Sequence, residues 1–344
     1  MGSPRASGSE ALPGPPRSVL VINVSRIGDT LLVTPALRAL ASAWPAAQVH
    51  FLGHPKRFEI IRHLPFVASA GPLSKQRALW RGWLRARRFD LAIVLGFDRA
   101  LVAYALRVAR HVVAFRQGVG ALDAQLFRCV EPPAFQSMHA ARIPLLLTRA
   151  LQLPDAGLRL AYHVTEEERQ RAAATLRRVL PAQAAPVIGF QVASFPTKAF
   201  RDWPLDSFAE LGARIAARWP RAHLLLLGGA TDRRRTGELA QRLDGRATSL
   251  AGGYSLRESA ALMSRLDLYV GVDTGPTHIM GALAPPMVAM YHCQSPSHFL
   301  MPLERPRCEV VDHPRTQGCS AETPMSEIGV DAVWERVLRT LAAP

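Results

Sequence analysis

The chain has 344 residues, of which 49% are apolar, and a formal net charge of +15 at pH 7. This length predicts about two domains of ordinary size, each able to bury its own core. No run approaches the roughly eighteen apolar residues that a membrane-spanning helix needs, so we expect a soluble protein.

The first predicted elements follow an amino-terminal tail. Residues 1–17 are rich in glycine, proline and serine and lack the apolar core of a signal peptide, so we expect a disordered tail. Residues 19–24 predict a strand, and the apolar spacing of residues 30–44 predicts a helix that Pro45 ends. The turn between them reads Ser25-Arg26-Ile27-Gly28-Asp29.

Two sets of short apolar strands alternate with helix-length segments, which favours parallel βαβ units. The first set continues with residues 49–52, 91–95 and 112–115, and the second comprises 187–192, 223–227, 268–272, 287–291 and 309–311. Between the sets, Thr165 and Glu168 fit a capping box that opens a polar helix to about residue 180. The sequence therefore predicts an α/β protein with domains at 18–160 and 186–344, joined by a linker helix region at 161–185.

The positive charge is concentrated in the first domain. Residues 1–160 hold 21 Lys/Arg against 8 Asp/Glu, a net +13, whereas residues 161–344 hold 21 against 19, a net +2. A merely arginine-rich, solvated surface is the plain alternative, because charge alone does not fix function. The asymmetry suggests that the first half faces an anionic partner.

The sequence contains no recognisable motif for binding a metal ion, a dinucleotide cofactor or ATP in a P-loop. The four cysteines are widely scattered, at Cys129, Cys293, Cys308 and Cys319. They have no metal-ligand spacing and fit a reduced cytoplasmic setting. Neither a G-x-G-x-x-G after the first strand nor a P-loop is present, which argues against dinucleotide oxidoreductases and P-loop ATPases. We expect no metal ligands and no cofactor.

The most informative segment is the turn after the predicted strand 268–272. It reads Asp273-Thr274-Gly275-Pro276-Thr277-His278. In alternating α/β proteins, ligands collect beyond the carboxyl ends of strands, where the next helix offers unpaired N–H groups. The alternative is that Asp273 or Thr274 is an ordinary helix cap. An aspartic protease would need a second such aspartate, and Asp-Thr-Gly occurs once.

Other charged residues also follow predicted strands. Asp29 is either a helix cap or a general base that takes a proton from a hydroxyl. Lys198 and Arg201 follow the strand 187–192, where a phosphate would lie, or else they are solvated loop charges. Asp232 follows a double glycine at the end of the strand 223–227, where a nucleotide could lie. A double glycine is weak evidence for nucleotide binding when the full glycine-rich motif is absent.

In this order and separation, S-x-x-G-D after the first strand and D-[TS]-G-x-x-H late in the chain resemble the glycosyltransferase family 9 heptosyltransferases. The resemblance covers residues 18–342 and includes Arg201-Asp202-Trp203-Pro204. It implies a GT-B fold, with two facing Rossmann-like domains and an interdomain cleft. The amino-terminal domain would bind the acceptor and the carboxyl-terminal domain the nucleotide sugar. The last helix is a candidate to pack back on the amino-terminal domain.

The resemblance also implies a metal-independent reaction that moves a heptose from ADP-heptose to a lipopolysaccharide inner-core sugar with inversion. Asp29 falls at the catalytic-base position, and Ser25, Arg26 and Gly28 are expected to bind the acceptor. Arg201 falls at the family's phosphate-contacting lysine position, and Tyr254 falls where the family places a side chain against adenine. We expect eight donor-binding residues: Lys198, Arg201, Asp232, Tyr254, Asp273, Thr274, Gly275 and His278.

The implied partners are the nucleotide sugar and an anionic glycolipid whose lipid A phosphates and Kdo carboxylates would account for the basic first domain. No nucleic-acid partner is expected. The implied location is the cytoplasm, either free or peripheral on the inner membrane. One loop departs from the family, which usually has Gly-Pro-Thr-x-Pro where residues 291–296 read Tyr-His-Cys-Gln-Ser-Pro. This departure leaves a transferase of another nucleotide sugar open as an alternative. Two further alternatives are a GT-B-like sugar-nucleotide epimerase and a noncatalytic anion-binding protein.

Overall fold

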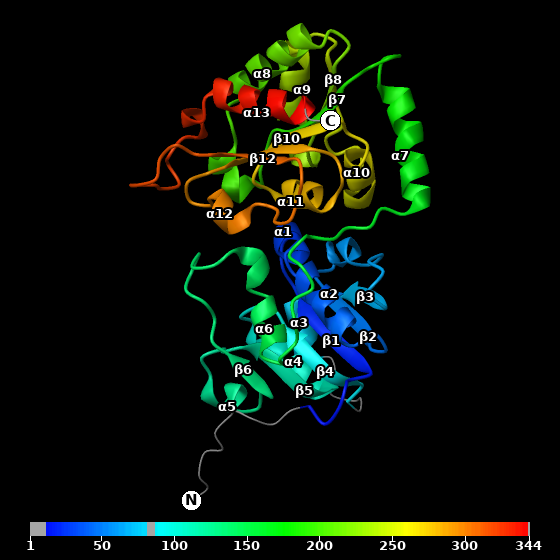
Figure 1. Ribbon diagram of the computed structural model, residues 1–344, viewed down its shortest axis with the longest axis vertical. Helices are drawn as coiled ribbons and strands as arrows, with labels where there is room; N and C mark the ends of the chain where they lie inside the picture. Colours follow the sequence, from blue (N-terminus) through cyan, green and yellow to red (C-terminus); the bar gives the residue numbers. More distant parts are fainter. Residues whose placement is uncertain (1–11, 81–86, 343–344) are drawn as a thin grey trace, which may run out of the picture. The chain divides into compact units, whose positions relative to one another are not determined.

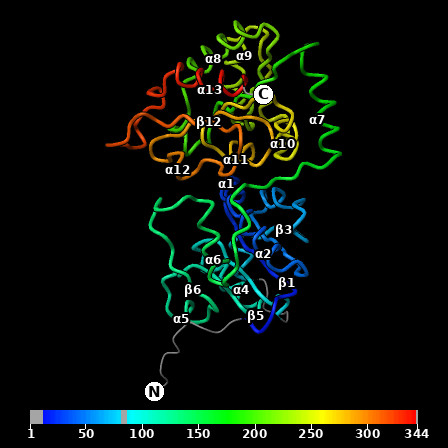
Figure 2. Tube along the Cα trace, in the orientation of Figure 1, coloured from blue at the N-terminus to red at the C-terminus, as the bar shows by residue number. Residues whose placement is uncertain are grey.

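The computed structural model describes residues 12–80 and 87–342, which form two compact units, Met1–His163 and Val164–Pro344 (Figure 1). Most of the predicted tail lies outside the described residues. Each unit contains a parallel six-stranded sheet with helices packed against it, which confirms the predicted α/β fold. The path of the chain through each unit can be followed in Figure 2.

The first sheet has the strand order β3-β2-β1-β4-β5-β6. Its strands are β1 (Ser18–Asn23), β2 (Gln48–Gly53), β3 (Ser69–Pro72), β4 (Phe89–Val94), β5 (Ala109–Phe115) and β6 (Arg128–Val130). The helices of this unit are α1 (Ile27–Leu31), α2 (Thr34–Ala43), α3 (Lys75–Trp80), α4 (Arg99–Val108), α5 (Gly120–Asp123) and α6 (Leu145–Arg149), with 3-10 turns at η1 (Phe58–Ile60) and η2 (Ala140–Arg142). The central strands β1 and β4 are almost entirely buried, as an apolar strand covered on both faces should be.

The helix predicted at 30–44 is wrong in its bounds, because the chain forms two helices there. α1 begins earlier, at Ile27, and α2 begins at Thr34. Pro35 lacks the N–H that would continue the helical ladder to the carbonyl of Leu31. The hydroxyl of Thr34 donates to that carbonyl instead, at 2.7 Å. The break leaves α1 as a short helix directly after β1.

The second sheet has the order β12-β11-β10-β7-β8-β9. Its strands are β7 (Val187–Gln191), β8 (His223–Leu227), β9 (Ala247–Ser249), β10 (Leu268–Val272), β11 (Met287–Tyr291) and β12 (Cys308–Asp312). The helices are α7 (Glu166–Val179), α8 (Leu205–Arg218), α9 (Arg233–Arg242), α10 (Leu256–Met263), α11 (Gly275–Ala282), α12 (Ser297–Leu300) and α13 (Val330–Ala342), with 3-10 turns at η3 (Pro196–Arg201), η4 (Ala230–Asp232) and η5 (Met325–Glu327). α13 packs against α8 and β12 of its own unit.

The two sheets share one topology. In each, the first strand of the unit lies beside the fourth, so that β1 pairs with β4 and β7 with β10. The connections leave these paired strands in opposite directions, and ligands of doubly wound sheets bind outside the carboxyl ends of such strands. The turns after β1, β7 and β10 are therefore the places where the fold favours a site.

A buried ion pair fastens α7 to α10. The predicted capping box is present, since Thr165 Oγ1 accepts the N–H of Glu168 at 3.2 Å and Glu168 Oε2 accepts that of Thr165 at 2.8 Å. The same carboxylate accepts from Arg257 Nε at 2.5 Å and Nη2 at 2.7 Å, with both side chains 9% exposed. Burial alone would raise the pKa of Glu168, but the hydrogen bonds from Arg257 and Thr165 lower it to about 2.

Glu168→Gln is expected to lower the free energy of unfolding by about 3 kcal/mol at pH 7, because it breaks a buried ion pair by removing the carboxylate that accepts two hydrogen bonds from Arg257. The wild type has this stabilisation in full above the ordinary glutamate pKa of 4.5 and loses it as the pH falls toward 2. Urea unfolding at several pH values measures the difference, which should shrink in acid. Glu167→Gln, in an exposed pair with Arg171, is the matched control and should change little. A difference that stays constant down to pH 2 would contradict this role of Glu168.

Candidate active site

The turn between β10 and α11 holds a buried carboxylate that does not cap the helix. Asp273 is 2% exposed; its Oδ2 accepts from Arg201 Nη1 at 2.5 Å, and its Oδ1 lies 3.4 Å from His278 Nε2. Thr274 occupies the N-cap position of α11 without a side-chain cap bond. The backbone N–H groups at the start of α11 therefore keep their capacity for an anionic ligand.

Arg201 connects three strand ends of the second sheet. It lies at the end of η3, which follows β7, and it pairs with Asp273 after β10. Its Nη2 also donates to Ser295 Oγ at 2.6 Å, and Ser295 follows β11. The alternative of a solvated loop charge is therefore wrong for Arg201. Lys198, on the same 3-10 turn, is half-buried with its ammonium 5.4 Å from the centre of the Phe200 ring.

Three buried polar atoms around this ion pair have no hydrogen-bond partner in the described part of the chain. They are Arg201 Nε, His278 Nδ1 and Gln191 Oε1. Gln191 is the last residue of β7, so all three atoms come from the carboxyl-end region of the second sheet. Buried polar groups rarely stay unpaired in proteins, and a polar ligand at this edge would supply the partners.

Tyr269 supports the turn between β10 and α11, and the sequence analysis did not select it. Tyr269 is fully buried in β10, and its hydroxyl lies 2.8 Å from Thr277 Oγ1. A Cβ on Gly271 would lie 2.7 Å from the Tyr269 hydroxyl, so a glycine is needed there. Burial raises the pKa of Tyr269, which keeps the hydroxyl protonated. A tyrosine in a strand is usually core, and only the hydrogen bond to α11 identifies this one as a support.

Asp232 and Tyr254 belong to a second group of turns, after β8 and β9. Asp232 Oδ2 accepts the Gly229 N–H at 2.8 Å, and the Gly252 N–H donates to the carbonyl of Gly228 at 3.0 Å. The two turns therefore lie side by side. Tyr254 lines a pocket between α7 and α10. The contacts that join Arg201 to the ends of β10 and β11 do not involve these two residues.

In the first unit, the turn after β1 presents an exposed carboxylate. Asp29 lies in the first turn of α1, whose N-cap position is taken by Arg26 without a side-chain cap bond. Asp29 Oδ2 accepts from Ser25 Oγ at 2.7 Å, and Arg57 donates to the carbonyl of Ser25 at 3.0 Å. Asp29 is therefore held by Ser25 rather than used as the helix cap, and Gly28 precedes it within α1.

The second unit also contains a disulfide between Cys293 and Cys319. The expectation of scattered cysteines in a reduced setting did not anticipate this pair. The partners are 26 residues apart, and the loops after β11 and β12 bring them together. His292 lies beside them, and the three potential ligand atoms of His292, Cys293 and Cys319 are within 4.8 Å of one another.

Comparisons with known proteins agree with the topology. A family model described as glycosyltransferase family 9 (heptosyltransferase) matches residues 76–326. Lipopolysaccharide heptosyltransferase 2 of Escherichia coli is 26% identical, over 94% of this chain and 97% of that relative. The solved structure of Escherichia coli ADP-heptose heptosyltransferase II has a TM-score of 0.76 at 21% identity, covering 94% of this chain and 98% of that one. An Escherichia coli heptosyltransferase solved with ADP has a TM-score of 0.70 at 20% identity, covering 94% and 99%. These likenesses confirm the GT-B fold.

Proposed function

The chain belongs to glycosyltransferase family 9, and from this we propose that it transfers a heptose from ADP-heptose to a lipopolysaccharide inner-core acceptor, with inversion and without a metal ion. Membership makes the protein a glycosyltransferase, and the sugar, the acceptor and the mechanism are the proposed parts. One observation carries the donor half: Arg201, Asp273 and His278 meet at the switch point of the second sheet with polar atoms left unpaired.

The proposed donor site is built to hold a diphosphate. Arg201 Nε would donate to a phosphate oxygen, while Asp273 and Ser295 hold the guanidinium in place. Gly275 lets the backbone at the start of α11 approach the phosphates, and the unpaired N–H groups there favour negative charge. Lys198 supplies a second cation. The relative that was solved with ADP supports this nucleotide as the leaving group.

The nucleoside would extend toward the second group of turns. An aromatic ring such as that of Tyr254 stacks on a base, and Asp232 follows the glycine turn beside it. His278 Nδ1, which is buried and unpaired, is available to a sugar hydroxyl or a phosphate oxygen. This assignment uses seven of the eight residues that the sequence analysis selected for the donor, and the eighth, Thr274, occupies the N-cap position of α11 beside them.

The proposed chemistry is one displacement. Asp29 accepts the proton of the acceptor hydroxyl, whose oxygen attacks the anomeric carbon as the bond to the diphosphate breaks. The electron pair leaves with ADP, and the cations and helix N-terminus of the donor site meet the charge that develops. Attack from the side opposite ADP inverts the anomeric centre. Ser25 orients the base, and Arg26 and Gly28 border the acceptor.

The acceptor would be an anionic glycolipid. The first 160 residues carry 21 Lys/Arg against 8 Asp/Glu, which suits phosphates and carboxylates. Large apolar side chains are also exposed in this unit, namely Leu79, Trp80, Phe97 and Phe135. In the described residues, no helix combines the length and apolar character that crossing a bilayer requires. We propose a cytoplasmic location with peripheral contact at the inner membrane.

Reversing the basic cluster Arg81, Arg85, Arg87 and Arg88 to glutamate is expected to raise the acceptor KM about tenfold, because the acceptor is polyanionic. The donor KM should stay unchanged. Arg81 and Arg85 lie outside the described residues, so the pair Arg87→Glu/Arg88→Glu is measured separately. Reversal of the exposed Arg177 and Arg178 of the second unit is the matched control. An unchanged acceptor KM would show that these basic residues do not contribute to acceptor binding.

The proposed function is tested by measuring the thermal shift of the purified protein with each member of a panel of nucleotide sugars. ADP-heptose should give the largest thermal shift, followed by transfer to a lipopolysaccharide-core acceptor. The departure of residues 291–296 from the family pattern makes other sugars a necessary part of the panel. A changed sugar after incubation of the donor alone would favour an epimerase instead. Salt-dependent binding to generic DNA without transfer would favour a noncatalytic anion-binding protein.

A further inference from the structure

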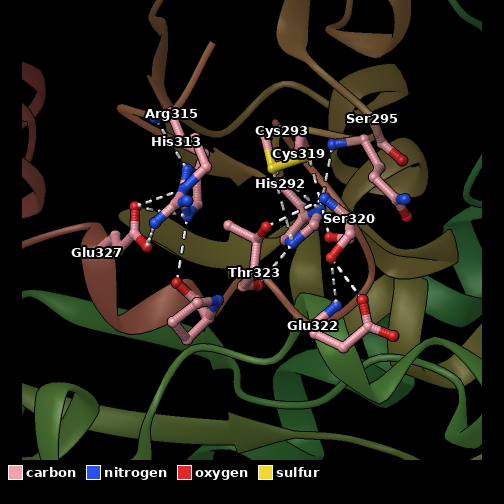
Figure 3. Close-up of a disulfide and its surroundings, with 12 residues drawn as sticks. His292, Cys293, Ser295, His313, Arg315, Cys319, Ser320, Glu322, Thr323 and Glu327 are labelled. Carbon is pink, nitrogen blue, oxygen red and sulfur yellow. Dashed lines mark hydrogen bonds and ion pairs between the residues drawn. A yellow bond between two sulfur atoms is a disulfide. The ribbon is translucent and has the colours of Figure 1, made fainter. Parts of the chain in front are cut away.

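The loop after β12 is held by two equivalent histidines, His292 from the turn after β11 and His313 at the start of the loop itself. Tyr291 and Asp312 are register partners, so His292 and His313 follow at the same level of the sheet. His292 Nε2 lies 2.9 Å from the carbonyl of Thr323, and His313 Nε2 lies 3.1 Å from that of Pro324. Figure 3 shows both rings directed at this stretch of the loop.

The Nδ1 atoms of both rings are also in use. His292 Nδ1 accepts the N–H of Gln294, and His313 Nδ1 accepts that of Arg315, each at 3.1 Å. An accepting Nδ1 carries no proton, so Nε2 is the donor in the hydrogen bond of each ring to the loop. Burial lowers the pKa of His292, which favours the neutral form of this ring.

The disulfide is the covalent part of the same attachment. Cys293 follows His292 directly, and Cys319 comes from the loop that both histidines hold (Figure 3). Between β12 and α13 this loop has regular structure only at η5, within the described chain, so it depends on such cross-links for its position. Both cysteines are half-buried, which leaves the bond accessible to a small dithiol.

The turn that carries Cys293 ends at the donor site. The Ser295 N–H donates to the carbonyl of His292 at 2.7 Å, which closes the turn. The Ser295 hydroxyl, buried in this turn, accepts from Arg201 Nη2 at 2.6 Å. The ring of His292 also packs edge-on against Phe200, with centroids 5.0 Å apart, and Phe200 precedes Arg201 in η3. The cross-linked turn therefore contacts η3 at two neighbouring residues, Arg201 through Ser295 and Phe200 through His292.

We propose that the Cys293–Cys319 disulfide positions Ser295, and through it Arg201, so that the affinity of the donor site depends on the redox state of this pair. The inference rests on the proposed function, because Arg201 is taken to hold the diphosphate. Cys293, Cys319 and Ser295 are positioning residues. Reduction removes the covalent link between the turn and the loop 313–328 and leaves the His292–Thr323 hydrogen bond to join them. The turn then loosens, which weakens the contact of Ser295 with Arg201 and leaves Asp273 as the main partner of that guanidinium.

The redox step is an ordinary thiol–disulfide exchange with an external dithiol. One thiolate of the dithiol attacks a sulfur of the bridge and forms a mixed disulfide. The second thiol of the reagent then attacks the mixed disulfide and displaces the protein sulfur. Cys293 and Cys319 are left as thiols, and the reagent is left as a disulfide. Two electrons and two protons pass to the protein.

A metal centre is the competing use of the same atoms. A metal held by both sulfurs and His292 would need a free ring nitrogen. Both nitrogens of His292 already face backbone groups, at 2.9 and 3.1 Å. The hydrogen bonds therefore favour the cross-link over a metal site.

The test uses full-length protein with Cys129→Ser and Cys308→Ser, so that only the bridging pair responds to thiol reagents. Calorimetric titration with ADP should show affinity about fivefold to tenfold weaker after reduction with dithiothreitol, the effect of one ordinary hydrogen bond, because the contact of Ser295 with Arg201 is weakened rather than removed. Reoxidation should restore the affinity. In the transfer assay, reduction should raise the donor KM and leave the acceptor KM unchanged.

Ser295→Ala separates positioning from general loosening. On the same background, this variant should bind ADP weakly in both redox states, because the contact that reduction disturbs is already absent. A reduction effect of equal size in Ser295→Ala would overturn the proposal. Zinc binding by the reduced protein that restores full ADP affinity would also overturn it, in favour of a metal centre.

Hydrogen exchange followed by mass spectrometry tests the positioning role of the disulfide without any ligand. Reduction should speed exchange in peptides covering residues 290–301, 313–328 and 196–204, and leave peptides of β1 and β4 unchanged. Unchanged exchange in the first three would refute the positioning role. Failure of the oxidised protein to bind ADP, with exchange changed as expected, would instead count against the proposed donor site and leave the cross-link established.

Discussion

An Asp29→Asn enzyme is expected to lose about a hundredfold to ten-thousandfold in kcat, the usual contribution of a general base. The amide keeps the size of the side chain and an oxygen that accepts from Ser25, but it does not take a proton from the acceptor hydroxyl. The affinity for ADP should be unchanged, since no donor-binding residue is altered. Transfer of labelled heptose to a core acceptor and calorimetry with ADP measure the two quantities.

Ser25→Ala is the matched variant for this prediction. It removes the hydroxyl that lies 2.7 Å from Asp29 Oδ2 and leaves the carboxylate, so the loss in kcat should be about tenfold at most. If the Asn variant retains transfer at the wild-type rate, Asp29 is not the base. A loss in Ser25→Ala as large as that in Asp29→Asn would mean that the hydroxyl itself takes part in proton transfer.

The central strands of both sheets were predictable from the sequence, as was the edge strand β12, whereas the edge strands β3, β6 and β9 were not. β1 and β10 are apolar runs buried on both faces, and this pattern needs no knowledge of the rest of the chain. β3 reads Ser-Ala-Gly-Pro and is at most half-buried, and β9 has three residues. Such segments become strands because β2 and β8 offer them hydrogen bonds, so their local composition carries little signal.

The candidate site was predictable residue by residue but not as an arrangement. Asp273 and Arg201 were each selected because they follow a strand, yet their ion pair joins positions 72 residues apart. Ser295 was noticed only as part of an unusual loop. Its contact with Arg201 depends on the order β11-β10-β7, which brings three strand ends together. Strand order is a property of the whole sheet, and no local pattern encodes it.

The helix-cap alternatives also show that a local sequence pattern does not determine the role of a residue. Aspartate and threonine at the start of a helix predict a cap and an anion site equally well, because both roles use the same unpaired N–H groups. The geometry separates the two roles for Asp273, whose carboxylate turns to Arg201 and His278. At Thr165 and Ser255, by contrast, the side-chain hydroxyl does form a capping box.

Replacement of Arg201 by methionine is expected to lower kcat/KM for the donor by about a hundredfold to a thousandfold, the usual cost of removing one hydrogen-bond donor from a developing negative charge. Two effects add. The diphosphate loses a donor, and Asp273, 2% exposed, becomes an unpaired carboxylate facing the anion. Arg201→Lys should fall between the wild type and Arg201→Met, because an ammonium keeps the charge but does not reach both Asp273 and Ser295 as the guanidinium does.

Two further variants separate lost binding from lost folding. The double variant Arg201→Met/Asp273→Asn removes the unpaired buried charge, so its thermal stability should exceed that of Arg201→Met while ADP binding stays weak. Lys198→Met is the matched cation on the same turn, half-buried beside Phe200, and should cost less. A larger loss of ADP affinity in Lys198→Met than in Arg201→Met would assign the diphosphate to Lys198. Arg201 would then be only the bridge between Asp273 and Ser295, since those hydrogen bonds do not require a ligand.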